Sequence, residues 1–198
     1  MWDQGTIPLL EETLRIRKEI EQKQSELNDL RRQFTPQPVD NYTLKNWEGQ
    51  SVTLSDLFAG KEDLIVIHNM GRKCSYCTLW ADGFNGVHHH LSDRAAFVVV
   101  SPDEPEIQKA FAEGRGWGFR MLSGHESPFI KDMGFVDKED NSYWPGVSTF
   151  RKLPDGSIER VAADIFGPGD PYNSLWHLFD MLHGGAGNWQ PQFNYHKK

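Results

Sequence analysis

Two cysteines, Cys74 and Cys77, are the feature that most constrains what this chain can fold into. They are the only cysteines among 198 residues, and they stand three positions apart. If a helix begins at the first, the second lies about one turn further on, where a disulfide closes with little backbone movement. The spacing therefore predicts one site that contains both thiols, in a fold that starts a helix there.

The residues around the pair predict a strand that leads into that helix. Residues 63–68 form a short apolar, β-branched run, which is typical of a buried central strand. After a break, residues 78–84 have the pattern of a helix start, although Gly83 and Gly86 weaken it. We therefore expect Cys74 at or just before a helix N-terminus.

A cysteine in that place is expected to be reactive. The free N–H groups and the dipole of a helix N-terminus stabilise an anion, and Arg72 and Lys73 add positive charge beside Cys74. Both effects favour the thiolate, which is the reactive form of the side chain. Cys74 is the predicted attacking thiol, and Cys77, which lies further into the helix and is less exposed, is the predicted resolving thiol.

Three other uses of such a pair fit the sequence less well. A c-type haem site needs a histidine directly after the second cysteine, where Thr78 stands. A two-cysteine, two-histidine zinc site needs a second histidine soon after His90, and residues 94–96 contain none. A structural pair of buried cysteines predicts apolar neighbours, whereas the residues before Cys74 are basic. Zinc and a structural pair stay open as alternatives.

The composition is that of an ordinary soluble protein. The length predicts one domain with additions, and 38% hydrophobic residues can form a proper core. A net charge of −7 argues against nucleic-acid binding. No apolar run reaches the length of a membrane span, and the first residues lack a signal-peptide pattern. A cytoplasmic location is therefore expected, where such a cysteine pair is catalytic or metal-binding more often than a structural staple.

Three parts are expected along the chain. Residues 1–38 comprise a charged helix, from about 8 to 34, and a proline-containing linker. Residues 39–185 form the compact domain, and residues 186–198 are an aromatic, polar tail with no predicted structure.

The charged helix carries an apolar stripe, interrupted at Lys23 or Gln24. Its members are Ile16, Ile20, Leu27, Leu30 and Phe34. The stripe is either half of a homodimer interface or a face that packs on the chain's own domain.

The compact domain is predicted to be an α/β sandwich with a mixed sheet, because a strand–helix–strand unit is followed by a hairpin and a helix. Strands are expected at 42–45, 51–54, 63–68, 95–100, 119–122, 147–152 and 157–162. Helices are expected at 55–58, 104–113 and 174–182, besides the one that follows the cysteines. The last helix is expected to bury Leu175, Leu178, Phe179 and Leu182.

Over residues 39–185 these features resemble the thioredoxin superfamily, which implies a three-layer α/β/α sandwich. The leading hairpin, residues 44–57, is similar to that of peroxiredoxin-like proteins. The run from 74 to 84, with Met70-Gly71 before it and residues 189–192 near the end, more closely resembles an uncharacterised family of predicted dithiol–disulfide oxidoreductases, domain-of-unknown-function family 899. The charged N-terminal helix also fits that family.

The resemblance implies a role for His68. Thioredoxins place a buried carboxylate six residues before the first cysteine, where it moves a proton to and from the resolving thiol; here that position is His68. A histidine titrates in the useful range and is a candidate for the same role. The alternative is a core histidine with a satisfied hydrogen bond.

The resemblance also implies a proline, normally cis, that faces the cysteines. Counting back from Gly156 places that position at Val147, while Pro145 lies two residues earlier, so both stay open. Further candidates for a substrate groove are Arg72, Lys73, Tyr76 and Trp144. The segment 123–144 is expected to border the cysteines, its aromatic residues forming either a groove or the core beneath it.

The leading functional prediction is a thiol–disulfide oxidoreductase that acts on a protein or small-molecule disulfide or thiol. It needs no metal and no cofactor beyond the Cys74–Cys77 disulfide. A thiol peroxidase is the second prediction, but peroxiredoxins have a threonine three residues before the cysteine, where Gly71 stands. The third is a non-enzymatic binding module that uses the N-terminal helix or the tail aromatics Trp189, Phe193 and Tyr195.

Three consecutive histidines occupy residues 88–90. They are either a surface metal site or a solvated helix end.

Overall fold

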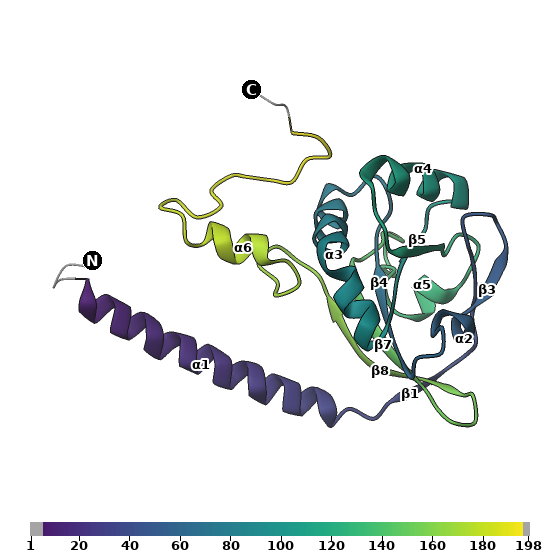
Figure 1. Cartoon of the computed structure of the whole chain (residues 1–198), viewed down its shortest axis with the longest axis horizontal. Coiled ribbons are helices and arrows are strands. Elements are labelled where there is room, and N and C mark those ends of the chain that lie inside the picture. Colours follow the sequence, from purple (N-terminus) through teal and green to yellow (C-terminus); the bar gives the residue numbers. More distant parts are fainter. Residues whose placement is uncertain (1–5, 196–198) are drawn as a thin grey trace. The chain divides into compact units, whose positions relative to one another are not determined.

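Eight strands form one mixed sheet in the computed structural model, which describes residues 6–195 (Figure 1). The strands are β1 (Gln37–Val39), β2 (Thr43–Lys45), β3 (Ser51–Thr53), β4 (Asp63–His68), β5 (Ala96–Ser101), β6 (Arg120–Ser123), β7 (Gly146–Lys152) and β8 (Ile158–Ile165). Their order is β1-β8-β7-β4-β5-β6-β2-β3. Strands β4, β5 and β6 run parallel, while β7 pairs antiparallel with β4 on the other side. The predicted mixed sheet is confirmed.

Helices cover both faces of this sheet, which gives the three layers (Figure 1). The helices of the domain are α2 (Leu54–Leu57), α3 (Ser75–Arg94), α4 (Pro105–Arg115), α5 (Phe129–Asp132) and α6 (Ser174–Phe179), and α1 (Ile7–Arg32) precedes the domain in the chain. Helices α3 and α4 connect β4 to β5 and β5 to β6, and two right-handed crossovers in the same direction lie on the same face. Helices α2 and α5 lie on the other.

Strand β4 separates two apolar cores because its side chains alternate between the faces. Ile67 packs with Trp80 of α3 in one core, whereas Leu64 and Val66 pack with Phe129 of α5 in the other. The cysteine pair belongs to the start of α3, and therefore to the first face.

The N-terminal helix is a separate unit, since the chain divides between Pro36 and Gln37. Helix α1 begins at Ile7, as the proline at the next position favours, and none of the residues 7–32 that form it is buried. Its bounds agree with the expected range of about 8 to 34. The expected linker is shorter than predicted, because Gln37 and Pro38 pair with Arg160 and Glu159 in the sheet.

The end of the domain differs from the prediction. Helix α6 ends at Phe179, and Leu178 and Leu182 are 62% and 57% exposed, so the expected apolar face is wrong there. Trp176 is the buried residue of this helix. Its ring contacts Trp189, with centroids 5.8 Å apart, so the tail packs on the domain.

The segment between β6 and β7 fills the core on the face opposite α3. Phe129, Met133 and Phe135 are buried there, while Tyr143 and Trp144 are exposed. Phe129, Met133 and Phe135 therefore belong to the core, which was one of the two alternatives for the large side chains of this segment.

Candidate active site

Cys74 is the residue that precedes the first turn of α3. Its backbone is extended, with φ −97° and ψ 108°, and its Sγ accepts a hydrogen bond from the backbone N–H of Cys77 at 3.0 Å. The sulfur thus takes the place that a serine or aspartate oxygen has at an ordinary helix start. Thr78 strengthens this first turn, because its hydroxyl donates to the Cys74 carbonyl at 2.9 Å. The expected position of Cys74 at the helix N-terminus is confirmed.

The two thiols differ in exposure and in pKa. Cys74 is half-buried and Cys77 is 3% exposed; both are free thiols. A hydrogen bond from the Cys77 thiol lowers the pKa of Cys74 to about 7, opposed by burial and aided by the backbone N–H groups of Cys77 and Tyr76. The same hydrogen bond, with burial and the Cys74 charge, raises the pKa of Cys77 far above its usual range. Near neutral pH Cys74 is therefore the cysteine that ionises, while Cys77 stays a thiol.

The basic residues before Cys74 contribute differently from what the sequence indicated. Arg72 and Lys73 are exposed, and neither is among the causes of the lowered Cys74 pKa. What Arg72 does contribute is its backbone, whose N–H donates to Asp103 Oδ2 at 2.8 Å. That contact holds the turn before the helix.

The same carboxylate lies close to Gly71. A Cβ on this residue would lie 2.9 Å from Asp103 Oδ2, and its φ of +97° is strained for any other residue. The backbone N–H of Gly71 donates to Asn69 Oδ1 at 2.8 Å. The turn is thus fixed by Asn69 and Asp103, which sequence reasoning missed because their role depends on contacts between β4, β5 and the turn.

Cys77 receives a further contact from the turn. The backbone N–H of Met70 donates to Cys77 Sγ at 3.4 Å, and this contact opposes the rise in the Cys77 pKa. Met70 was part of the motif that carries the family resemblance, which is the one signal in the sequence that pointed to it.

Aromatic side chains line the helix next to the cysteines. Tyr76, between the two cysteines, contacts Trp80 and Trp176 with ring centroids 6.2 Å away in each case. Trp80 also donates to Asp170 at 3.3 Å, and Asn173 donates to the Leu79 carbonyl at 3.2 Å. These contacts hold the chain after β8 against α3. They also bring Trp176 to the site, although no local pattern pointed to this residue.

His68 lies on the opposite face of β4 from α3. It is 1% exposed, its ring stacks on Phe135 with centroids 3.7 Å apart, and its Nε2 is 2.9 Å from Ser148 Oγ. Burial, followed by the charge of Arg160, lowers the pKa of His68 well below 6.5. Nδ1 of His68 has no hydrogen-bond partner among residues 6–195. These neighbours are those of a core histidine, and the proton-transfer role stays a prediction.

The two candidates for the position that faces the cysteines lie close together at the start of β7. Every peptide bond within residues 6–195 is trans, including the one before Pro145. Val147 pairs with Ile67 of β4 and packs in the core under α3, on the face of the cysteines. Trp144 is 43% exposed, and its Nε1 is 3.4 Å from Asp137 Oδ2. Val147 therefore lies on the face of the sheet that also carries Tyr76. Trp144 instead contacts Asp137, which belongs to the same loop.

Two broader observations complete the site. Within residues 6–195, no three or more His, Cys, Asp or Glu side chains gather closely enough to hold a metal ion. In the same part of the chain, no helix combines the length and the apolar character that a bilayer crossing requires.

Comparison with known proteins supports the thioredoxin-like fold. Chloroplastic peroxiredoxin Q of Populus jackii is 26% identical over 147 residues, which are 74% of this chain and 68% of that protein. The structure of reduced Prx3 from Vibrio vulnificus in complex with H2O2 is similar with a TM-score of 0.55 and 16% identity, over 69% of this chain and 90% of that one. A cysteine-to-serine mutant of PrxQ from Xylella fastidiosa gives a TM-score of 0.54 and 18% identity, over 67% of this chain and 85% of that one.

The family itself is established by a match over almost the whole chain. The model of the family described as "Bacterial protein of unknown function (DUF899)" matches residues 9–197. The match includes the N-terminal helix, the cysteine pair and the C-terminal segment that carried the resemblance. This chain is therefore a member of the DUF899 family of bacterial proteins of unknown function, built on a thioredoxin-like fold.

Proposed function

We propose that this protein is a dithiol–disulfide oxidoreductase in which Cys74 attacks and Cys77 resolves. One observation carries the proposal: a thiolate with a pKa of about 7 accepts a hydrogen bond from a buried thiol one helical turn further on. A structural cysteine pair has no need of this asymmetry, whereas thiol exchange requires one nucleophilic and one protected sulfur.

The reaction consists of two exchanges. The Cys74 thiolate attacks one sulfur of a substrate disulfide, the substrate S–S bond breaks, and the leaving thiolate takes a proton from water. Cys77 then loses its proton and attacks Cys74 Sγ, which breaks the mixed disulfide and releases the second substrate thiol. Two electrons pass from the cysteine pair to the substrate, and the reverse sequence oxidises a dithiol.

The pKa values of the two cysteines explain why Cys74 reacts first and Cys77 second. Two of the causes that raise the Cys77 pKa are its hydrogen bond to Cys74 and the charge of Cys74. Both end when Cys74 enters a mixed disulfide, whereas the Met70 N–H contact, which favours the thiolate, remains. Cys77 therefore becomes easier to deprotonate when its attack is needed.

A thiol peroxidase is the second candidate, and the relatives named above favour it. In that reaction the Cys74 thiolate takes an oxygen from a peroxide to give a sulfenic acid and an alcohol or water, and Cys77 then forms the disulfide with loss of water. Against it stands Gly71, at the position of the peroxiredoxin threonine: glycine has no hydroxyl, and the φ of +97° at this position is strained for any other residue.

Redox titration of the purified, metal-free protein against defined dithiol buffers tests the proposal. Alkylation with a mass tag counts free thiols at each potential, without ambiguity because the chain has two cysteines. We expect one reversible two-electron transition, within the roughly −120 to −270 mV range of thioredoxin-like enzymes. If no intramolecular disulfide forms at any potential, the proposal fails and the pair is structural or metal-bound.

Two serine variants distinguish the candidates. With a model disulfide, Cys77→Ser should trap a mixed disulfide on Cys74, while Cys74→Ser should not react. With hydrogen peroxide, the oxidoreductase predicts slow oxidation of Cys77→Ser, no faster than that of a free thiolate of the same pKa. Rapid sulfenic acid formation at Cys74, together with peroxide turnover by a thiol donor, would instead establish the peroxidase.

A further inference from the structure

Seven positions of α1 alternate at spacings of four and three residues between Leu9 and Leu30. Five of them are apolar, and Thr13 and Lys23 complete the series. The apolar members are Leu9, Ile16, Ile20, Leu27 and Leu30. This alternation is a heptad repeat, with Thr13, Ile20 and Leu27 at the a positions and the others at d. A repeat of that kind forms the seam of a coiled coil rather than the broader apolar face of a helix in a globular core.

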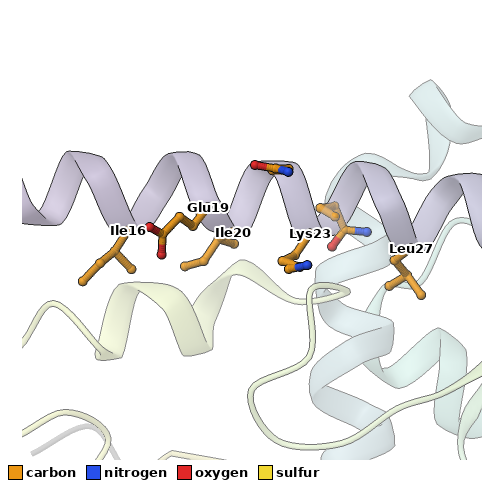
Figure 2. A pocket seen from close by; sticks show the side chains of 7 residues that line it. Ile16, Glu19, Ile20, Lys23 and Leu27 are labelled. Atoms are coloured by element: carbon orange, nitrogen blue, oxygen red, sulfur yellow. The ribbon is translucent and has the colours of Figure 1, made fainter.

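The seam side chains are uncovered along the helix. Ile16, Ile20 and Leu27 are 44%, 63% and 42% exposed. Figure 2 shows these three side chains and Lys23 projecting from the same side of α1, where they line a shallow groove with Glu19. A helix of this length with an exposed apolar seam needs a partner that buries it.

The residues that flank the seam are charged in a fixed pattern. The g positions hold Glu12, Glu19 and Glu26, and the e positions after Leu10 hold Arg17, Gln24 and Arg31. One edge of the seam is therefore acidic, and the other is basic or neutral. Because e and g are polar over most of the helix, the apolar stripe is narrow, which favours two strands over larger bundles.

We propose that α1 binds a second copy of itself as a parallel, in-register, two-stranded coiled coil. In that arrangement each g residue faces the e residue five positions later in the other copy. Glu12 then faces Arg17 of the other copy, and Glu26 faces Arg31, each pair occurring twice by symmetry. Glu19 faces Gln24, which is neutral.

The antiparallel arrangement is disfavoured by the same charges. There, g positions face g positions and e positions face e positions. The acidic edges of the two copies would meet, and so would the basic edges. A helix from another protein would need a complementary charge pattern of its own, whereas a second copy of α1 supplies that pattern in register.

Contacts within the helix are compatible with this pairing. Arg15 binds Glu12 and Glu19, and Lys23 binds Glu26 at 2.8 Å. Exposed pairs of this type are weak and exchange partners readily. Lys23, the one charged residue in the seam, extends its aliphatic part along the seam and its ammonium group toward Glu26.

A charge-exchange experiment on the full chain tests the proposal. One variant carries Glu12→Lys and Glu26→Lys, and the other carries Arg17→Glu and Arg31→Glu. The wild type should have twice the monomer mass of 22.7 kDa in sedimentation velocity. Each variant alone should dissociate more readily, with a dissociation constant higher by roughly one to two orders of magnitude. An equimolar mixture should recover the dimer as a heterodimer.

The matched control is Glu11→Lys with Glu21→Lys, which makes the same charge change off the seam and should leave the dimer intact. Glutamate and lysine have similar helix propensity, so the variants keep the helix. A monomeric wild type would overturn the proposal. So would variants that stay dimeric, a mixture that does not recombine, or a control that dissociates like the seam variants.

Orientation has its own test. In a protein with Cys74→Ser and Cys77→Ser, the change Leu9→Cys places one thiol near the N-terminal end of the seam. Parallel, in-register helices bring the two copies of this position together, so oxidation should link the dimer covalently. Antiparallel helices place the two thiols at opposite ends, and absence of the link in a dimeric sample would overturn the parallel arrangement.

Discussion

The thiolate at Cys74 is stabilised by its partner cysteine and by the first turn of α3. The Cys77 thiol donates to it, as do the backbone N–H groups of Cys77 and Tyr76. The neighbouring basic side chains point into solvent, where water screens their charge. The reactive state is thus a property of the pair rather than of the local charge.

Removing the Cys77 thiol should raise the Cys74 pKa. We expect the iodoacetamide alkylation rate of wild-type Cys74 to rise with a midpoint near pH 7, since the thiolate is the reacting form. In Cys77→Ala the midpoint should move toward the ordinary thiol value, because the strongest donor is lost. Cys77→Ser is the matched control, since its hydroxyl still donates and its midpoint should stay lower than that of the alanine variant. Identical midpoints in all three proteins would contradict this account.

His68 should make the protein less stable in mild acid. Its folded-state pKa is depressed, so below pH 6.5 the unfolded chain binds a proton that the folded chain does not. The free energy of unfolding should therefore fall as the pH drops below 6.5, by up to about 1.4 kcal/mol per pH unit from this residue, until the folded pKa is reached. Above pH 6.5 the effect is absent.

The comparison of wild type with His68→Gln isolates this contribution, because glutamine does not titrate and can still bond to Ser148. Urea unfolding between pH 7.5 and 5 should show a steeper pH dependence in the wild type. Equal slopes would mean that His68 takes up its proton as readily in the folded protein as in the unfolded chain. If the variant folds but exchanges disulfides much more slowly, the proton-transfer role of His68 gains support instead.

At the scale of elements, α3 carries two glycines that have different functions. The helix runs through both of them to Arg94, although each costs helix stability. A Cβ at Gly83 would lie 3.0 Å from Asn173 Nδ2, whereas a Cβ at Gly86 would meet nothing within 4 Å. Gly83 therefore permits close packing of the segment before α6, and Gly86 contributes no packing.

The two glycines provide a matched pair of variants. Gly86→Ala should raise the free energy of unfolding by about 1 kcal/mol, through helix propensity alone. Gly83→Ala should gain less than that or destabilise, because Asn173 must move and its bond to the Leu79 carbonyl is disturbed. Thermal unfolding measures both, since a change of this size shifts Tm by about 2–4 °C. If both variants gain the same free energy of unfolding, Asn173 moves aside without destabilising the protein.

At the scale of the whole molecule, the two units are expected to have separate tasks. Residues from Gln37 onward contain both apolar cores and the cysteine pair, while α1 contains the heptad seam. We therefore expect the domain to fold without the helix, and we infer that association resides in the helix.

Removal of residues 1–36 tests this division. The remaining chain should keep the redox transition of the cysteine pair and a cooperative thermal unfolding. It should also have the mass of a monomer at concentrations where the full chain is dimeric. A truncated protein that is still dimeric would locate the interface on the domain, and one that fails to unfold cooperatively would show that the domain needs the helix.

Several features could be predicted from sequence because they depend on neighbours in the chain. The strand at 63–68, the helix start at Cys74 and the hairpin strands β7 and β8 follow from local apolar patterns and turn residues. The greater exposure of Cys74 than of Cys77 followed from their order along one helix. These local patterns, together with the family motif, predicted the fold class.

Other features were decided only when distant segments met. Strand β1 pairs with β8 at an open edge of the sheet. No local sequence pattern predicts this pairing, because the two strands are far apart in the chain. Contacts between separate elements decide where three side chains lie. His68 packs on Phe129, the Asp103 carboxylate lies beside Gly71, and the Trp176 ring lies against Tyr76. The sequence by itself determined that two thiols sit at the start of a helix behind a buried strand. The tertiary structure decided which of them ionises, because burial and hydrogen bonds set a pKa, and both exist only in the assembled fold.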